Sequence, residues 1–143
     1  MGLALDQEGK DILDAKLTGF NRKPKIFDGQ LDEIDVNSFN FKIPKRKKDK
    51  PPPNFMPLEE QSKHKYILNI DGHVKAFRLG NELRMGSVIL LVDSPYTLWF
   101  QDKLIEDKHY VLVNDDLSNL EEKINWCIDH EEECSQIAQN ALE

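Results

Sequence analysis

Three short apolar runs at near-regular intervals constrain the fold of this chain more than any other feature. They span residues 66–70, 88–92 and 110–113, and each is mostly apolar without the alternation of a half-exposed strand. Strands that are buried on both faces have this composition. The two intervals between the runs contain amphipathic segments of helical length, residues 76–85 and 95–104. Repeated strand–helix–strand units predict an α/β domain with a parallel sheet, right-handed crossovers and flanking helices.

Two more helices are predicted after the third run. Ser118 and Glu121 have the S-x-x-E spacing of a capping box, and Asp129 and Glu132 repeat this spacing before a second apolar face. The acidic run at residues 131–133 offers ligands for a cation, but the helix macrodipole alone favours carboxylates in a first turn. We therefore interpret the acidic run as structural.

The first part of the chain has a weaker pattern. Residues 11–17 predict a short helix, and residues 42–50 carry six positive charges and one Asp, followed by three prolines. Such a segment repels itself and favours an extended conformation. It resembles a nuclear-import signal or a phosphate-binding patch, but no aromatic residues that could stack on bases lie between its charges. We therefore divide the chain into a loosely ordered lead-in with a basic and proline-rich linker, residues 1–57, and a globular domain, residues 58–143.

Composition limits the class of protein further. A net charge of -7 and an isoelectric point near 5.1 argue against a general nucleic-acid binder. No signal peptide is apparent at the N-terminus, and the run at residues 88–92 is too short to span a bilayer. We therefore predict a cytoplasmic protein without a membrane segment. Cys127 and Cys134 lie in a helical stretch, and free thiols are preferred to a bridge between them.

The ends of the predicted strands are the first place to search for a ligand site. In an open parallel sheet, ligands bind beyond the carboxyl ends of the strands. These ends are residues 71–72, 93–94 and 114–116, and all three are polar and carry carboxylates.

The segment after the first strand is the most informative of the three. Gly72 permits close approach of a ligand to the backbone, and the following helix N-terminus would present N–H groups to a phosphate. Arg78 lies just inside that helix and would add a bidentate clamp on a pyrophosphate. The alternative is that Arg78 pairs with a surface carboxylate such as Glu82.

The sequence offers no recognisable metal site or known catalytic motif. The spacing of His64, His73 and His109 fits no compact ligand set, and a structural role is preferred for His109. No G-x-S-x-G elbow, Walker loop or G-x-G-x-x-G fingerprint is present. We expect neither a metal nor a bound cofactor, and no catalytic residue is assigned.

A series of segments in the second half of the chain forms an ordered pattern. The segments are KYILNIDG at 65–72, FRL at 77–79, MGSVIL at 85–90, DSPYTLWF at 93–100, HYVLV at 109–113, DLSNL at 116–120, INW at 124–126 and IAQNA at 137–141. In this order they closely resemble the central motifs of glycosyltransferase family 90. That family includes fungal capsule-associated proteins, animal protein O-glucosyltransferases and lipopolysaccharide-modifying relatives.

The resemblance implies a Rossmann-like domain that forms the C-terminal half of a GT-B glycosyltransferase and binds a nucleotide sugar, with a UDP-sugar as the expected donor. It implies that Arg78 holds the donor pyrophosphate in a site that works without a metal. It also implies that Asp71, Gly72 and Phe77 shape the donor pocket. Ser87 matches a small residue near the donor, where it either contacts the phosphate or serves packing.

The resemblance also bears on activity. Family members place the general base in an N-terminal domain, and we expect this chain to begin after that domain and to contain only the donor-binding half. Its expected partners are the nucleotide sugar and an acceptor domain, supplied by another chain or by the rest of a longer protein. The alternatives are a non-catalytic nucleotide-binding module and a protein that uses the exposed domain face for interaction.

Overall fold

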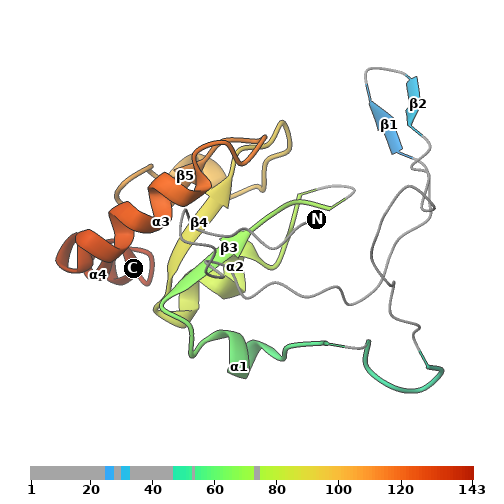
Figure 1. Ribbon diagram of the computed structural model, residues 1–143, viewed down its shortest axis with the longest axis horizontal. Coiled ribbons are helices and arrows are strands. Elements are labelled where there is room, and N and C mark those ends of the chain that lie inside the picture. The colour runs from blue at the N-terminus through green and yellow to red at the C-terminus, as the bar shows by residue number, and fades with distance from the viewer. Residues whose placement is uncertain (1–24, 28–29, 33–46, 53, 73–74) are drawn as a thin grey trace.

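The computed structural model describes residues 25–27, 30–32, 47–52, 54–72 and 75–143 (Figure 1). The helix predicted at residues 11–17 and most of the lead-in lie outside the described residues. The division of the chain at residue 57 therefore stays a prediction.

A three-stranded parallel sheet is the centre of the fold. It consists of β3 (Tyr66–Asn69), β4 (Val88–Val92) and β5 (Val111–Val113), in the order β3-β4-β5. Tyr66 is in register with Val88, and the last paired residues of β4 and β5 are Val92 and Val113. The three apolar runs thus become the three strands, to within one residue at each end.

Helices cover both faces of this sheet. On one face lie α3 (Leu120–Asp129) and α4 (Glu131–Asn140), and on the other lies α2 (Leu79–Glu82), which continues as the 3-10 turn η2 (Leu83–Met85) (Figure 1). All five residues of β4 are buried, so the central strand contacts both layers. The α3 and α4 layer packs on Val88, Leu90, Val92, Val111 and Val113. The α2 layer packs on Ile67, Ile89 and Leu91. This layered α/β arrangement confirms the predicted class and is consistent with a Rossmann-like fold.

The segment between β4 and β5 differs from its prediction. Instead of an amphipathic helix over residues 95–104, it contains only the 3-10 turn η3 (Gln101–Lys103). Two side chains at its start bind the backbone locally: Asp93 accepts from the N–H of Ser94, and Ser94 accepts from that of Tyr96. Such bonds compete with helix formation.

The two C-terminal helices are confirmed, but their predicted capping boxes are wrong. Helix α3 begins at Leu120 after Asn119, and neither helix has a side-chain cap. The amide oxygen of Asn119 instead accepts from the N–H of Asn114, and the hydroxyl of Ser118 accepts from the Asn114 side chain. These polar side chains close the turn after β5 rather than the first turn of the helix.

Three short elements precede the sheet. Strands β1 (Lys25–Phe27) and β2 (Gln30–Asp32) pair antiparallel, and α1 (Leu58–Gln61) is one helical turn with no buried residue. The sequence pattern did not predict β1 or β2. Across the described ranges, no helix has the length and apolar character needed to cross a membrane.

Candidate functional site

The carboxyl ends of β3, β4 and β5 lie along one edge of the sheet because the strands are parallel. The N–H of Asp93, just after β4, donates to the carbonyl of Val113 at the end of β5 over 2.8 Å. The predicted residues Asp71, Gly72, Phe77 and Arg78 all belong to the connection that leaves this edge after β3.

Arg78 is held at this edge by two hydrogen bonds. Its Nε donates to Oε1 of Glu82 over 2.9 Å, and its Nη2 donates to the carbonyl of Ile70 over 2.8 Å. The Arg78 side chain nevertheless stays 45% exposed. The alternative pairing with Glu82 is therefore present, and it leaves part of the guanidinium accessible from solvent.

Glu82 is a buried carboxylate rather than the surface group assumed from the sequence. Its side chain is only 1% exposed, and its Oε2 accepts a hydrogen bond from Nδ2 of Asn69. Asn69 ends β3 and is itself fully buried. The guanidinium of Arg78 is thereby connected through Glu82 to the sheet.

Asp71 forms a second buried interaction at the same edge. Its Oδ1 accepts from the N–H of Ala76 over 2.7 Å, and its Oδ2 lies 3.5 Å from Nζ of Lys75. The side chains of Asp71 and Lys75 are 13% and 5% exposed. Asp71 therefore holds the connection after β3 in place.

The helix N-terminus predicted to bind a phosphate is not formed as expected. Helix α2 begins at Leu79, not at Ala76, and is four residues long. The N–H of Ala76 is bound by Asp71, and that of Leu79 donates to the carbonyl of Ala76. These two backbone donors are already satisfied, so Arg78 is the cationic group that the described residues of this connection offer at the surface.

Gly72 and Phe77 border the exposed side of the connection. A Cβ added to Gly72 would meet no heavy atom within 4 Å. The side chain of Phe77 is 84% exposed, next to Arg78 in sequence. An exposed aromatic ring beside a cation is suited to a ligand with a planar ring and a phosphate.

Ser87 lies away from these residues. It precedes β4, so the five residues of that strand, about 17 Å at the rise of a parallel strand, separate it from the carboxyl edge. Its hydroxyl is buried and donates to the carbonyl of His64 over 2.7 Å. This contact agrees with the alternative that Ser87 serves packing. A phosphate contact by Ser87 stays an untested prediction.

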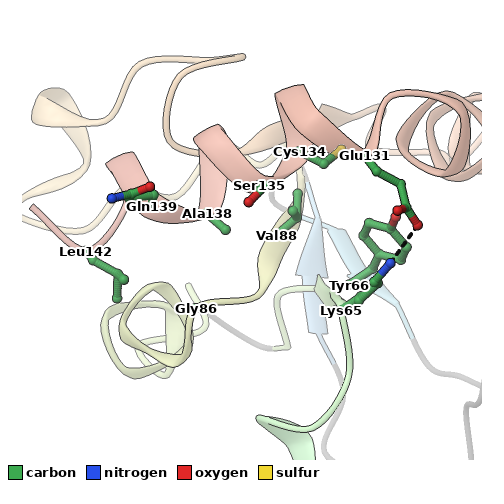
Figure 2. Close-up of a pocket in the computed structure, with 10 residues that line it drawn as sticks. All are labelled: Lys65, Tyr66, Gly86, Val88, Glu131, Cys134, Ser135, Ala138, Gln139 and Leu142. Carbon is green, nitrogen blue, oxygen red and sulfur yellow. Dashed lines mark hydrogen bonds and ion pairs between the residues drawn. The ribbon is translucent and has the colours of Figure 1, made fainter.

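A groove of about 510 Å³ lies at this amino end of the sheet, between α4 and the starts of β3 and β4 (Figure 2). Figure 2 shows Lys65 and Glu131 at one side of it, joined by an ion pair of 2.6 Å. The groove includes none of the predicted site residues.

Two other carboxylates at the strand ends, those of Asp93 and Asp116, take part in local turns. Oδ1 of Asp93 accepts from the N–H of Ser94, and Oδ1 of Asp116 accepts from that of Ser118. Hydrogen bonds from the side chain and backbone of Ser118 lower the pKa of Asp116, which keeps this carboxylate ionised. Neither arrangement resembles a carboxylate held ready to accept a proton from a substrate.

The structural role expected for His109 is confirmed. Its Nδ1 accepts a hydrogen bond from the backbone N–H of Ile105 over 2.8 Å. Within the described part of the chain, no group of three or more His, Cys, Asp or Glu side chains is arranged to hold a metal ion.

Sequence reasoning missed Asn69 and Lys75 as parts of this edge. Asn69 carried a signal, because a polar side chain inside an otherwise apolar buried strand requires a partner. Lys75 follows Asp71 at the i,i+4 spacing of an ion pair, but nothing in the pattern indicates that the pair is buried.

The sequence was compared with known protein families. A sequence profile of the family described as Glycosyl transferase family 90 matches residues 7–143. The match includes every residue of the carboxyl edge described above.

Several curated proteins are similar to this chain. The uncharacterized protein 179R of Invertebrate iridescent virus 6 is 42% identical over 146 residues, which cover 96% of this chain and 12% of the viral protein. Protein O-glucosyltransferase 2 of Danio rerio is 45% identical over 76 residues, 53% of this chain and 15% of that protein. Protein O-glucosyltransferase 3 of Homo sapiens is 31% identical over 134 residues, 94% of this chain and 22% of that protein. The chain thus spans less than a quarter of the length of each of these relatives.

Proposed function

Because the chain belongs to glycosyl transferase family 90, we propose that it forms the donor-binding part of a glycosyltransferase that uses a nucleotide sugar. The observation that carries this proposal is the guanidinium of Arg78, anchored at the carboxyl edge of the sheet and partly exposed. In this proposal the domain is the C-terminal one of a GT-B pair, and the sugar passes to a hydroxyl acceptor.

Arg78 acts on the leaving group in this scheme. Transfer of the sugar leaves negative charge on the nucleotide diphosphate, and a cation held in place before the reaction stabilises that charge. The planar guanidinium donates two parallel hydrogen bonds to phosphate oxygens. Its two protein contacts use Nε and one Nη2 hydrogen, which leaves donors for the pyrophosphate.

The donor nucleotide in this proposal is uridine diphosphate. Phe77 precedes Arg78 in the chain and presents a ring that is 84% exposed, and such a ring stacks on a planar base. Asp71 and Gly72 belong to the same connection after β3. The names of the relatives, protein O-glucosyltransferases, make UDP-glucose the first donor to test.

The general base is proposed to belong to another domain. Asp71, Asp93 and Asp116 already accept local hydrogen bonds, which supports a role in shaping the edge rather than in proton transfer. Inverting transfer needs a base positioned on the acceptor side. This arrangement favours donor binding without turnover as the function of the chain taken alone.

Calorimetric titration of the purified 143-residue chain tests the proposal. UDP and UDP-glucose are expected to bind saturably, and ADP and GDP, which have the same pyrophosphate and another base, are expected to bind more weakly. Absence of binding by UDP and UDP-glucose would contradict a donor site. Equal affinity for UDP, ADP and GDP would contradict the proposal that the site prefers uracil over the other nucleobases.

A further inference from the structure

Glu82 is an unusual residue to find in the apolar layer of this fold. Helix α2 buries it beside Leu79, and its side chain is 1% exposed. A carboxylate removed from water is strongly destabilising unless charges and hydrogen bonds compensate it. An apolar side chain of similar size would avoid this cost, so the position of Glu82 calls for an account of what the carboxylate does.

Both carboxylate oxygens of Glu82 are used, and they point to different elements. Oε2 accepts from Nδ2 of Asn69, the last residue of β3, and Oε1 accepts from Nε of Arg78. Asn69 is fully buried, whereas Arg78 is 45% exposed. The carboxylate therefore joins a buried amide at the end of β3 to a cation at the surface.

The contacts of Arg78 lie on one edge of its guanidinium. Nε donates to Glu82 and Nη2 donates to the carbonyl of Ile70. Together these two hydrogen bonds fix the orientation of the guanidinium plane. Among the described residues, no acceptor for Nη1 is found. The edge formed by Nη1 and Nη2 is thus the one left to meet an anion.

We propose that Glu82 is a positioning residue, which orients the guanidinium of Arg78 so that its Nη1 and Nη2 edge is presented to the pyrophosphate of the donor. This inference rests on the proposed function and adds the residue that prepares the site. A long Arg side chain that is already ordered loses less conformational freedom when the ligand binds. Glu82 acts through Arg78 and does not touch the ligand.

A purely structural role for Glu82 makes different predictions. If the carboxylate served only stability, its replacement would lower the melting temperature and would change affinity only through loss of folded protein. A purely electrostatic effect would also differ, because removal of a negative charge beside Arg78 would strengthen binding of a pyrophosphate. Positioning alone predicts a folded protein with weaker UDP binding.

Two substitutions separate these possibilities. Glu82→Leu keeps the approximate size of the side chain and removes the buried charge, but it leaves Nδ2 of Asn69 without an acceptor, so the melting temperature is expected to fall. Titrated below that temperature, the folded variant is expected to bind UDP with a dissociation constant roughly three- to tenfold higher. Glu82→Gln retains an oxygen that accepts from Nε of Arg78. If the side-chain amide of Asn69 rotates by 180°, its Oδ1, which has no partner now, can accept a hydrogen bond from the amide of the new glutamine. This variant is expected to bind UDP almost as the unmutated chain does.

A double-mutant cycle then shows whether Glu82 acts through Arg78. In the Arg78→Ala background, Glu82→Leu is expected to cause no further loss of UDP affinity. The exposed pair of Lys65 and Glu131 at the opposite end of the sheet supplies the control, and Glu131→Gln is expected to leave UDP binding unchanged.

The experiment combines UDP titration of these variants with the proton–nitrogen NMR signal of Nε of Arg78. In the unmutated chain and in Glu82→Gln, the chemical shift of this signal should differ from the shifts of solvent-exposed arginines. In Glu82→Leu it should move to the shifts of those exposed arginines. Equal or tighter UDP binding by Glu82→Leu would overturn the inference and leave the proposed function intact. An Nε signal unaffected by Glu82→Leu would overturn it as well. Absence of UDP binding by the unmutated chain would instead refute the proposed function, and the inference with it.

Discussion

Cys127 on α3 and Cys134 on α4 lie in the same buried cluster, which these two helices form against the sheet. Both cysteines are buried and neither is in a disulfide, which confirms the expectation of free thiols. Burial first, and then the contact with Cys134, raise the pKa of Cys127 to about 12 from its ordinary value of 9.0.

This raised pKa predicts a loss of stability at alkaline pH. The folded state holds the Cys127 proton more tightly than the unfolded state, so the contribution of the thiol is fully present below about pH 9 and is lost as the pH rises toward about 12. Within that window the free energy of unfolding should fall by about 1.4 kcal/mol per pH unit from this group. Denaturant unfolding at several pH values measures the slope.

Cys127→Ala separates the effect of Cys127 from that of other groups. Tyr66 and Cys134 also have raised pKa values, caused mainly by burial, and both remain in the variant. The variant is expected to show a shallower decline between pH 9 and 11. Identical slopes in both proteins would contradict the assignment to Cys127.

Leu90→Asp tests the position of the sheet. Leu90 is 2% exposed in the centre of β4, and an unpaired carboxylate there costs several kcal/mol against a total stability of about 5–15 kcal/mol. The variant should be unfolded by circular dichroism. Ile128→Asp is the control, because Ile128 lies on α3 with 55% exposure and its substitution should leave the domain folded. A folded Leu90→Asp variant would show that β4 is not the central strand.

The strands of the sheet could be predicted because their signal is local in the sequence. Each strand is a continuous apolar run, and β4 is buried on both faces as such a run implies. The segment after β4 was predicted wrongly, because hydrogen bonds that the Asp93 and Ser94 side chains accept from backbone N–H groups outweigh an amphipathic pattern in residues 95–104. Side-chain bonds of this kind depend on geometry that a hydrophobic period does not contain.

The candidate site was predictable only in part. Its location followed from the rule for parallel sheets, and Arg78 does lie at that edge. Burial of Glu82 was not predictable, because a charged residue at i+4 from Arg78 has the same spacing on a solvated helix face as on a buried one. The position of Ser87 at the opposite end follows from strand direction, which fixes which residues precede and which follow a strand.

Substitution of Arg78 is expected to affect stability as well as binding. Arg78→Ala leaves the buried carboxylate of Glu82 without its cation, which should lower the free energy of unfolding by about 1–3 kcal/mol. Arg78→Lys keeps a positive charge nearby and should recover part of this stability but little of the UDP affinity, since an ammonium group lacks the planar fork. Thermal unfolding in the absence of nucleotide measures the first effect. An unchanged melting temperature in Arg78→Ala would contradict the pairing with Glu82.

The chain alone is expected to transfer no sugar above background. Incubation with radiolabelled UDP-glucose and a hydroxyl acceptor, followed by counting of acceptor and of free glucose, measures this. The physical reason is that three strand-end carboxylates, Asp71, Asp93 and Asp116, already accept local hydrogen bonds, which disfavours each of them as the base that activates an acceptor. Robust transfer, abolished by substitution with Asn at one of the strand-end carboxylates, would show that the base lies within this chain. The candidates are Asp71, Asp93, Asp115 and Asp116.

The most direct test of the central claim compares UDP with uridine in the unmutated chain and in Arg78→Ala by titration calorimetry below the melting temperature of both. If Arg78 holds the pyrophosphate, the substitution should weaken UDP binding by roughly 2–4 kcal/mol, because charge-assisted hydrogen bonds are lost only in the complex. Uridine has no phosphate, so its binding should be nearly the same in both proteins. Equal UDP affinity of the two folded proteins would contradict the claim and leave Arg78 as the partner of Glu82 alone.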